Sequence, residues 1–176
     1  MKKILALSLL VTALELTARA ALAQTAAPAP AAGSTPAEEA AVRQVLTKYQ
    51  QAVQKLDTTG THRLFTANSQ VFESGGVEGT YSHYAAHHLA PELKEFSAFT
   101  FSDYKAAVQV DGPYAFATET YNYTINLKKA PQDKEAKAPI VRRGVATSVL
   151  RKNAAGQWQI LSTHSSARTP RPKKQG

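Results

Sequence analysis

PIVRRGVATSVLRKNAAGQWQILSTHSSAR, residues 139–168, is the stretch that decides the fold. In each half, apolar or small residues alternate with polar ones, and this period of two is typical of a half-buried β-strand. The segment at 153–156, NAAG, separates the halves and has the composition of a turn. The stretch therefore predicts two antiparallel strands joined by a short turn.

The same period of two extends towards the N-terminus. Residues 97–112 read SAFTFSDYKAAVQVDG and residues 114–129 read YAFATETYNYTINLKK, with a turn at Asp111, Gly112 and Pro113. Residues 128–139, KKAPQDKEAKAP, are a charged loop before the next strand. Four consecutive strands of this kind predict an antiparallel meander.

Helical periodicity precedes the strands. Apolar side chains recur three and four positions apart over residues 36–56, after a start that Thr35 can cap and Pro36 can open. The further predicted elements are a short helix at 61–66, a short strand at 69–75, and a third helix at 80–96, interrupted or re-phased at Pro91. The predicted fold class is α+β, with three N-terminal helices packed on a curved, mostly antiparallel sheet.

The two ends of the chain differ in composition from the middle. Residues 1–23 have an early pair of lysines, an apolar run and a terminal ALA, which is typical of a secretory signal peptide, so a periplasmic or secreted location is expected. Glu15 and Arg19 interrupt the apolar run, so no stable membrane insertion is expected after cleavage. The rest divides into an Ala/Pro-rich linker at 24–35, a folded domain at 36–168 and a basic disordered tail at 169–176.

Charge and cysteine content exclude several classes of function. The net charge of +8 falls mainly in the leader and in residues 168–176. Because the folded part has no basic stripe with interleaved aromatic residues, nucleic acid is not an expected partner. The chain has no cysteine, which excludes disulfides, thiolate catalysis and sulfur-based zinc sites. No glycine-rich phosphate loop is present either, and no cofactor is expected.

The order of these elements, together with two motifs, resembles the nuclear transport factor 2-like superfamily. GQWQILSTHSS at 156–166 is similar to the last strand of its SnoaL-like and polyketide-cyclase-like bacterial branches. GGVEGTYSHYAAHHLAPEL at 75–93 is similar to the segment in which their third helix begins. The resemblance implies a conical α+β barrel with a pocket at its open end, often in homodimers joined through the sheet. It implies no single chemistry, since members include isomerases, dehydratases, cyclases and non-catalytic modules.

Two histidines are the candidates for catalysis, and the first lies on the helix predicted at 80–96. His88 falls on the apolar side of that helix, whereas His83 and His87 fall on the opposite side. Glu92 follows His88 by four residues and shares its side if the phase is kept. A carboxylate there would raise the imidazole pKa and orient its proton, as a general base requires.

The second candidate is His164 in the last strand. A period of two places Trp158, Ile160 and His164 on one face, and the first two are large apolar residues that favour an inward orientation. The resemblance also implies that a histidine of this strand lines the cavity. His164 is therefore predicted to face His88 across a shared pocket.

Tyrosines and carboxylates are the candidates for ligand binding. Hydroxyl or carboxylic acid groups inside a water-poor cone can bind a developing oxyanion, and aromatic walls supply affinity. The ligand-binding residues predicted are Tyr49, Glu73, Tyr84, Glu92, Glu119, Tyr121 and Trp158.

The leading functional hypothesis is an exported domain that binds a small, partly apolar molecule in a conical pocket. One alternative is an acid/base enzyme of the isomerase, dehydratase or cyclase kind, in which His88 or His164 moves the proton. Another is a divalent metal site built from these two histidines with Glu73 or Glu92. A third is a non-catalytic association module, and a homodimer is an expected assembly in any of these cases.

Overall fold

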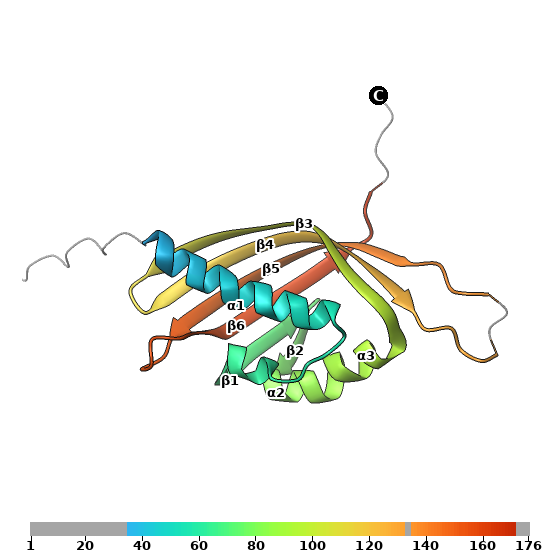
Figure 1. The fold of residues 1–176 in the computed structure, drawn as a ribbon, viewed down its shortest axis with the longest axis horizontal. Helices are drawn as coiled ribbons and strands as arrows, with labels where there is room; N and C mark the ends of the chain where they lie inside the picture. Colours follow the sequence, from blue (N-terminus) through green and yellow to red (C-terminus); the bar gives the residue numbers. More distant parts are fainter. Residues whose placement is uncertain (1–34, 133–134, 172–176) are drawn as a thin grey trace, which may run out of the picture.

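The computed structural model describes residues 35–132 and 135–171 (Figure 1). The expected signal peptide at 1–23, the expected linker apart from Thr35, and residues 172–176 of the expected tail lie outside the described residues. In chain order the elements are α1 (Pro36–Gln54), the 3-10 turn η1 (Thr61–Leu64), β1 (Phe65–Glu73), β2 (Gly76–Gly79), α2 (Tyr81–Tyr84), the π-helical turn η2 (Ala85–Leu89), α3 (Ala90–Glu95), β3 (Phe96–Asp111), β4 (Tyr114–Leu127), β5 (Ile140–Lys152) and β6 (Trp158–Arg168).

A bent, six-stranded sheet in the order β2-β1-β6-β5-β4-β3 forms the body of the molecule. β1 and β6 run parallel, and the other neighbouring strands run antiparallel. α1 lies across one face of the sheet, and the helical segment from α2 to α3 lies beside β1 and β2 (Figure 1). The predicted meander of four strands is found as β3 to β6, so the α+β class with a mostly antiparallel sheet is confirmed.

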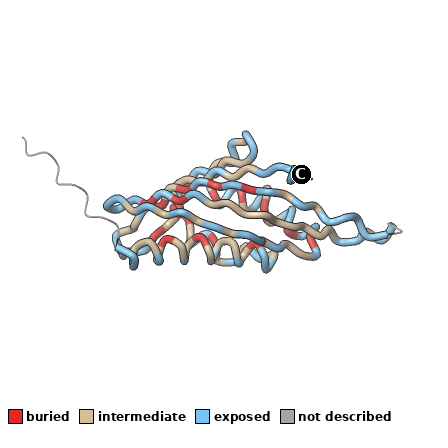
Figure 2. Tube along the Cα trace, turned by 90° about the horizontal axis from the view of Figure 1, so that it is seen from above, coloured by how far each residue is buried: buried red, intermediate tan, exposed pale blue. Residues whose placement is uncertain are grey.

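The core lies between the helices and the face of the sheet that they cover, where the buried positions gather (Figure 2). α1 contributes Val42, Leu46 and Val53, whose spacing places them on one stripe. They pack in the same cluster as Leu150 and Ile160 of the two central strands. The predicted amphipathic helix is therefore confirmed. Within the described residues, no helix combines the length and apolar character that crossing a membrane would require.

Two helical segments pack on the sheet, and not the three that the sequence predicts. The segment predicted as a second helix at 61–66 makes only one 3-10 turn before β1 begins at Phe65. The ring of Phe65 stacks on that of Tyr81 at 3.6 Å, while its backbone pairs with Ile160 of β6. Burial between sheet and helix thus overrides local helical preference. The short strand β2 was not expected either.

The second helical segment, residues 81–95, is re-phased immediately before Pro91, as the sequence predicts. The Ala90 N–H donates to the carbonyl oxygen of Ala85, five residues earlier, which makes η2 a π turn. A proline inside an α-helix clashes with the carbonyl four residues before it, and a wider turn relieves that clash. The result is one helical segment that changes phase between Tyr84 and Glu92.

Candidate ligand-binding cavity

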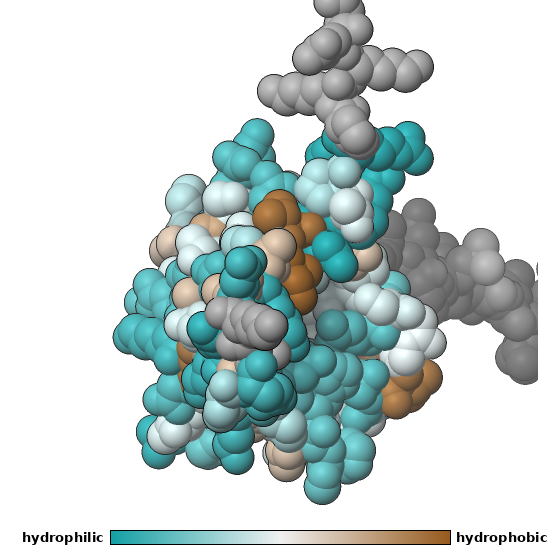
Figure 3. Space-filling model, turned by 90° about the vertical axis from the view of Figure 1, so that its right-hand side faces the viewer, coloured by the Kyte–Doolittle hydropathy of each residue, from teal (hydrophilic) through white to brown (hydrophobic). Residues whose placement is uncertain are grey.

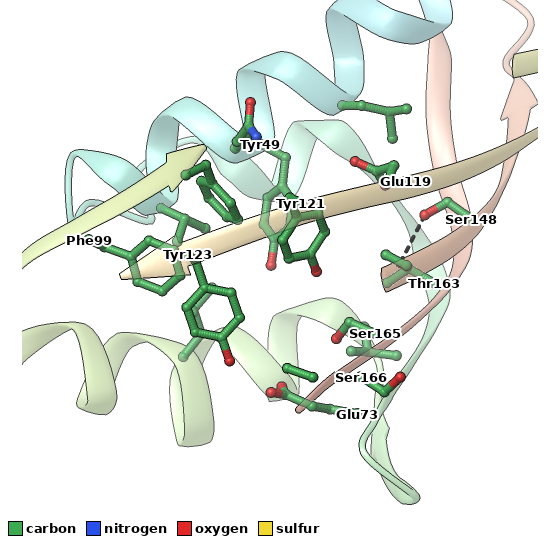
Figure 4. A pocket seen from close by; sticks show the side chains of 18 of the residues that line it. Tyr49, Glu73, Phe99, Glu119, Tyr121, Tyr123, Ser148, Thr163, Ser165 and Ser166 are labelled. Atoms are coloured by element: carbon green, nitrogen blue, oxygen red, sulfur yellow. Dashed lines mark hydrogen bonds between the residues drawn. The ribbon is translucent and has the colours of Figure 1, made fainter. Parts of the chain in front are cut away.

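A cavity of about 190 Å³ lies between α1, the second helical segment and the covered face of the sheet. Figure 4 shows the rings of Tyr49, Phe99, Tyr121 and Tyr123 gathered on one side, with Glu73 across from them. On the side towards which the β4–β5 hairpin extends, the surface is mainly hydrophilic and its hydrophobic areas are small (Figure 3). The lining residues are Leu46, Tyr49, Gln50, Val53, Val71, Glu73, Ser74, Tyr84, Leu89, Glu92, Phe99, Phe101, Tyr104, Glu119, Tyr121, Tyr123, Ile125, Ala146, Ser148, Ile160, Thr163, Ser165, Ser166 and Ala167.

A bulge in β3 sets the aromatic wall. Asp103 and Tyr104 together face the single residue Tyr121 of β4, because the pairing steps from Ser102 opposite Asn122 to Lys105 opposite Thr120. Asp103 has a positive φ of 52° and accepts a 2.6 Å hydrogen bond from the Asn122 amide. The extra residue shifts the alternation by one, which turns Tyr104 towards the cavity.

Glu119 is a half-buried carboxylate in the wall of the cavity. It lies two residues before Tyr121 on the same face of β4, and its Oε2 accepts a 2.7 Å hydrogen bond from the Tyr104 hydroxyl. Burial raises the pKa of the Glu119 carboxyl above its ordinary value, and the hydrogen bond from Tyr104 opposes that shift. The pKa of Tyr121 is raised as well, first by burial and then by the charge of Glu119.

A second tyrosine–carboxylate pair lies on the opposite wall. The Tyr84 hydroxyl donates a 2.7 Å hydrogen bond to Oε2 of Glu73, at the end of β1. Tyr84 is 8% exposed, and burial raises its pKa. Burial likewise raises the pKa of Tyr49 on α1, whose ring meets Tyr81 edge-on at 5.8 Å. These hydroxyls therefore stay protonated and act as hydrogen-bond donors at neutral pH.

His88 lies beside the cavity and does not line it, so its predicted position in the pocket wall is wrong. It contacts two lining residues, Glu92 and Tyr84. Its Nδ1 is 3.1 Å from Oε2 of Glu78, and its Nε2 is 3.3 Å from Oε1 of Glu92, which lines the rim. Glu78 can reach it because Glu78 is the extra residue of β2 in the pairing with β1. The hydrogen bond to Glu78, followed by the charge of Glu92, raises the pKa of His88, while burial opposes the shift. The expected contact between His88 and Glu92 is thus present, and His83 and His87 are exposed as expected.

His164 is exposed and does not line the cavity, so its predicted inward placement is wrong. Ile160 pairs with Leu150 and Ser162 pairs with Val149, which leaves Leu161 as an extra residue without a partner in β5. Beyond this bulge the inward positions are Thr163 and Ser165. The ring of His164 instead meets Phe72 edge-on at 6.5 Å.

Trp158 faces inward as predicted but lies apart from the cavity, at the start of α1. Its Nε1–H donates a 2.8 Å hydrogen bond to Oε2 of Glu38, and Lys152 Nζ donates to the other oxygen of that carboxylate at 2.5 Å. Trp158 is 5% exposed and is absent from the cavity lining. Its position therefore ties the first turn of α1 to β6, which corrects the expectation that it forms a wall of the pocket.

Six of the nine predicted site residues come together around one cavity: Tyr49, Glu73, Tyr84, Glu92, Glu119 and Tyr121. Lining residues that the predicted site left out include Phe99, Phe101, Tyr104, Tyr123, Ser148 and Thr163. The two hydroxyls of Ser148 and Thr163 are 2.9 Å apart and add a polar spot to the sheet wall. Across residues 35–132 and 135–171, no three His, Asp or Glu side chains are arranged to hold a metal ion. His88 and His164, the two histidines of the metal hypothesis, do not face a common site, because His164 is exposed.

Comparison with known proteins agrees with this architecture. The sequence model of the SnoaL-like domain matches residues 42–170, so the chain belongs to the SnoaL-like domain family of the nuclear transport factor 2-like superfamily. No curated protein matches the chain.

Solved structures of the superfamily share the fold at low sequence identity. A nuclear transport factor 2-like superfamily protein from Salmonella enterica serovar Typhimurium is 20% identical, with 78% of this chain and 96% of that one covered and a TM-score of 0.64. A protein of unknown function from Pseudomonas putida is 21% identical, with coverages of 81% and 95% and a TM-score of 0.61. A ketosteroid isomerase-like protein from Erwinia carotovora atroseptica is 18% identical, with coverages of 77% and 100% and a TM-score of 0.59. At these identities the likeness establishes the fold alone.

Proposed function

We propose that this domain binds a small, partly apolar molecule in the cavity between α1 and the sheet. The single observation that carries the proposal is the cavity itself, which has a volume of about 190 Å³ and is lined by Tyr84 and six further aromatic side chains. An apolar protein cavity on the order of 150 Å³ can hold one benzene molecule. The cavity therefore suits a ligand of about one ring, or a branched alkyl group, with a polar substituent.

Polar groups at separate points of the lining would orient such a ligand. Glu73 and Glu119 lie on different strands, each with a tyrosine hydroxyl hydrogen-bonded to one oxygen. The Ser148 and Thr163 hydroxyls lie on the sheet wall near Glu119 (Figure 4). Aromatic surface supplies the affinity and these few polar atoms supply the specificity, as is usual for small-molecule sites.

A cavity-filling variant tests this proposal. Ala146 on β5 lines the cavity and is 7% exposed, so Ala146→Phe places a ring inside it. Binding of benzyl alcohol and 3,3-dimethylbutan-1-ol is measured by protein-observed NMR. We expect saturable binding to the wild-type protein and none to Ala146→Phe. The matched control Thr147→Phe, on the exposed face of the same strand, retains binding. No saturable binding to the wild type, or equal binding to Ala146→Phe, contradicts the proposal.

Acid/base catalysis is a second candidate function, because Glu119 combines burial, a raised carboxyl pKa and a tyrosine hydroxyl within hydrogen-bonding distance. In its ionised form the carboxylate can take a proton from carbon next to a carbonyl group, while a second tyrosine such as Tyr121 donates to the resulting enolate oxygen. Deuterium exchange into cyclohexanone in D₂O tests this activity by NMR. We expect exchange faster than in buffer and its loss in Glu119→Gln; exchange at the buffer rate rejects the activity.

Export and self-association complete the proposal. The composition of residues 1–23 supports transport to the periplasm or the exterior, which cell fractionation with a C-terminal tag would test.

Exposed Phe116 of β4 and Val145 of β5 lie on the uncovered face of the sheet and support a homodimer through that face. Light scattering should give twice the chain mass, and Val145→Glu should return it to the monomer value; a monomeric wild type rejects the dimer.

A further inference from the structure

We propose that the occupant of the cavity is an organic cation, a small substituted ammonium ion with apolar groups, held between the carboxylates and the aromatic rings of the lining. This inference rests on the proposed binding function and names the class of ligand for it. The juxtaposition that carries it is an aromatic wall with Glu119 at one end and Glu73 at the other.

The charge of the lining is one-sided. Glu73, Glu92 and Glu119 all contribute to the wall, whereas no lysine, arginine or histidine occurs among the described residues that line it. Because Glu92 already contacts His88 from outside the wall, Glu73 and Glu119 are the carboxylates left for a cationic ligand. Tyr84 and Tyr104 each donate to one carboxylate oxygen, which satisfies hydrogen bonding without bringing a positive charge. A buried carboxylate is costly unless it is paired with opposite charge. A cationic ligand would supply that charge, while an anionic ligand would add to the repulsion.

The aromatic part of the wall suits the same charge. Phe99 stacks on Tyr123 with centroids 5.2 Å apart, and Phe101 meets Tyr121 edge-on at 5.2 Å. The rings of Tyr49, Phe99, Tyr121 and Tyr123 lie around one space (Figure 4), and Phe101 lines the same cavity. Ring faces carry negative electrostatic potential and attract ammonium groups, most strongly where water is excluded. Apolar substituents on the nitrogen would meanwhile fill the hydrophobic volume.

The position of the positive centre follows from the two ends of the cavity. Glu119 lies beyond the ring of Tyr121, next to Ser148 and Thr163, and Glu73 lies across from Tyr123 beside Ser165 (Figure 4). A compact ammonium group would sit over the Tyr121 ring, within reach of Glu119. The polar end of a longer ligand, with hydrogen-bond donors, would then extend towards Glu73.

Three probes of one branched skeleton separate charge from shape: choline, 3,3-dimethylbutan-1-ol and 3,3-dimethylbutanoate. Affinities for the whole protein are measured by isothermal titration and NMR at about pH 8, because a higher pH favours the ionised form of a carboxyl group whose pKa is raised by burial. We expect choline to bind about tenfold more tightly than the neutral alcohol, and the carboxylate to bind most weakly. Equal affinities for choline and the alcohol, both lost in Ala146→Phe, overturn the charge preference but leave the proposed binding function standing. Binding of neither probe inside the cavity overturns both.

Carboxylate variants locate the source of the preference. Glu119→Gln keeps an acceptor for the Tyr104 hydroxyl and removes the charge, so it should reduce the ratio of choline affinity to alcohol affinity several-fold. Glu73→Gln does the same for Tyr84 on the other wall. The matched control Glu95→Gln, at an exposed position on α3, should leave the preference unchanged. An unchanged preference in both Glu119→Gln and Glu73→Gln, with the fold intact, overturns the proposal.

Discussion

The ring of Tyr121 lies directly against the backbone of Gly144, so closely that a Cβ atom at Gly144 would come within 2.8 Å of its Cζ. The two residues are paired across β4 and β5, on the side of the sheet that faces the cavity. Gly144 is buried, and it is needed here for space, since any side chain would push the ring away. The shape of the cavity therefore depends on a residue that does not line it.

Gly144→Ala should displace the Tyr121 ring and alter the cavity. Overpacking of a well-packed position typically costs about 1–3 kcal/mol of unfolding free energy, and we expect a loss in this range together with weaker binding of benzyl alcohol. Urea unfolding and NMR titration measure the two effects. In a Tyr121→Ala background the same Gly144→Ala change should cost much less, because the clashing ring is gone. An equal loss of unfolding free energy in both backgrounds would show that the clash with the Tyr121 ring does not cause the destabilisation.

Trp158 is expected to contribute to stability and not to binding. Trp158→Ala removes a buried aromatic side chain and should lower the unfolding free energy by about 3–5 kcal/mol. The milder Trp158→Phe keeps a ring but loses the hydrogen bond to Glu38, so we expect a lower melting temperature with unchanged affinity for the cavity probes. A lower affinity in the folded Trp158→Phe protein would show that Trp158 contributes to ligand binding.

Glu119→Gln should make the empty protein more stable at neutral pH. The folded-state pKa of Glu119 is raised above 4.5, so the unfolded chain releases this proton first as pH rises, and the folded protein loses stability between 4.5 and the raised value. Glutamine does not titrate and still accepts from Tyr104. The variant should thus match the wild type near pH 4 and exceed it above. Denaturant unfolding at several pH values checks this; equal stabilities throughout would mean that Glu119 is solvated.

His88 should give the protein a second pH dependence. Its folded-state pKa is raised above 6.5 by Glu78 and Glu92, so its stabilising contribution is complete below pH 6.5 and is lost as pH rises through the raised value. Glu73 and the Tyr84 ring also lie near this imidazole. His88→Gln should flatten the fall in unfolding free energy between about pH 6 and pH 8. The exposed control His87→Gln should keep that fall in unfolding free energy. A fall that persists in His88→Gln would show that another titrating group causes it.

The sequence predicts the structure well where a strand or helix keeps one period along its whole length. The alternation in residues 114–127 runs without interruption, and it correctly places Glu119 and Tyr121 on the cavity side. The helix from Pro36 is equally clear, because cap, proline and apolar stripe agree. The segment 61–66 fails because the burial of Phe65 against Tyr81 depends on residues distant in sequence.

Bulges in β3 and β6 explain why the sequence pattern missed Tyr104 and gave His164 the wrong orientation. In β3 the bulge leaves a trace, since apolar side chains move from odd positions, Phe99 and Phe101, to even positions such as Val108. Reading that change of phase would have found Tyr104. In β6 the residues after Leu161 are small or polar on both faces, so the shift leaves no hydrophobic signal. The alternation in β6 therefore assigns His164 to the wrong face of the sheet.

A crystal structure of the protein grown with saturating benzyl alcohol tests most directly whether the cavity binds a small, partly apolar molecule. We expect electron density for the ring inside the cavity, in contact with Tyr121 and Phe99, at full occupancy. A ligand found only on the outer surface, or a cavity closed by its own side chains, would contradict the proposed function.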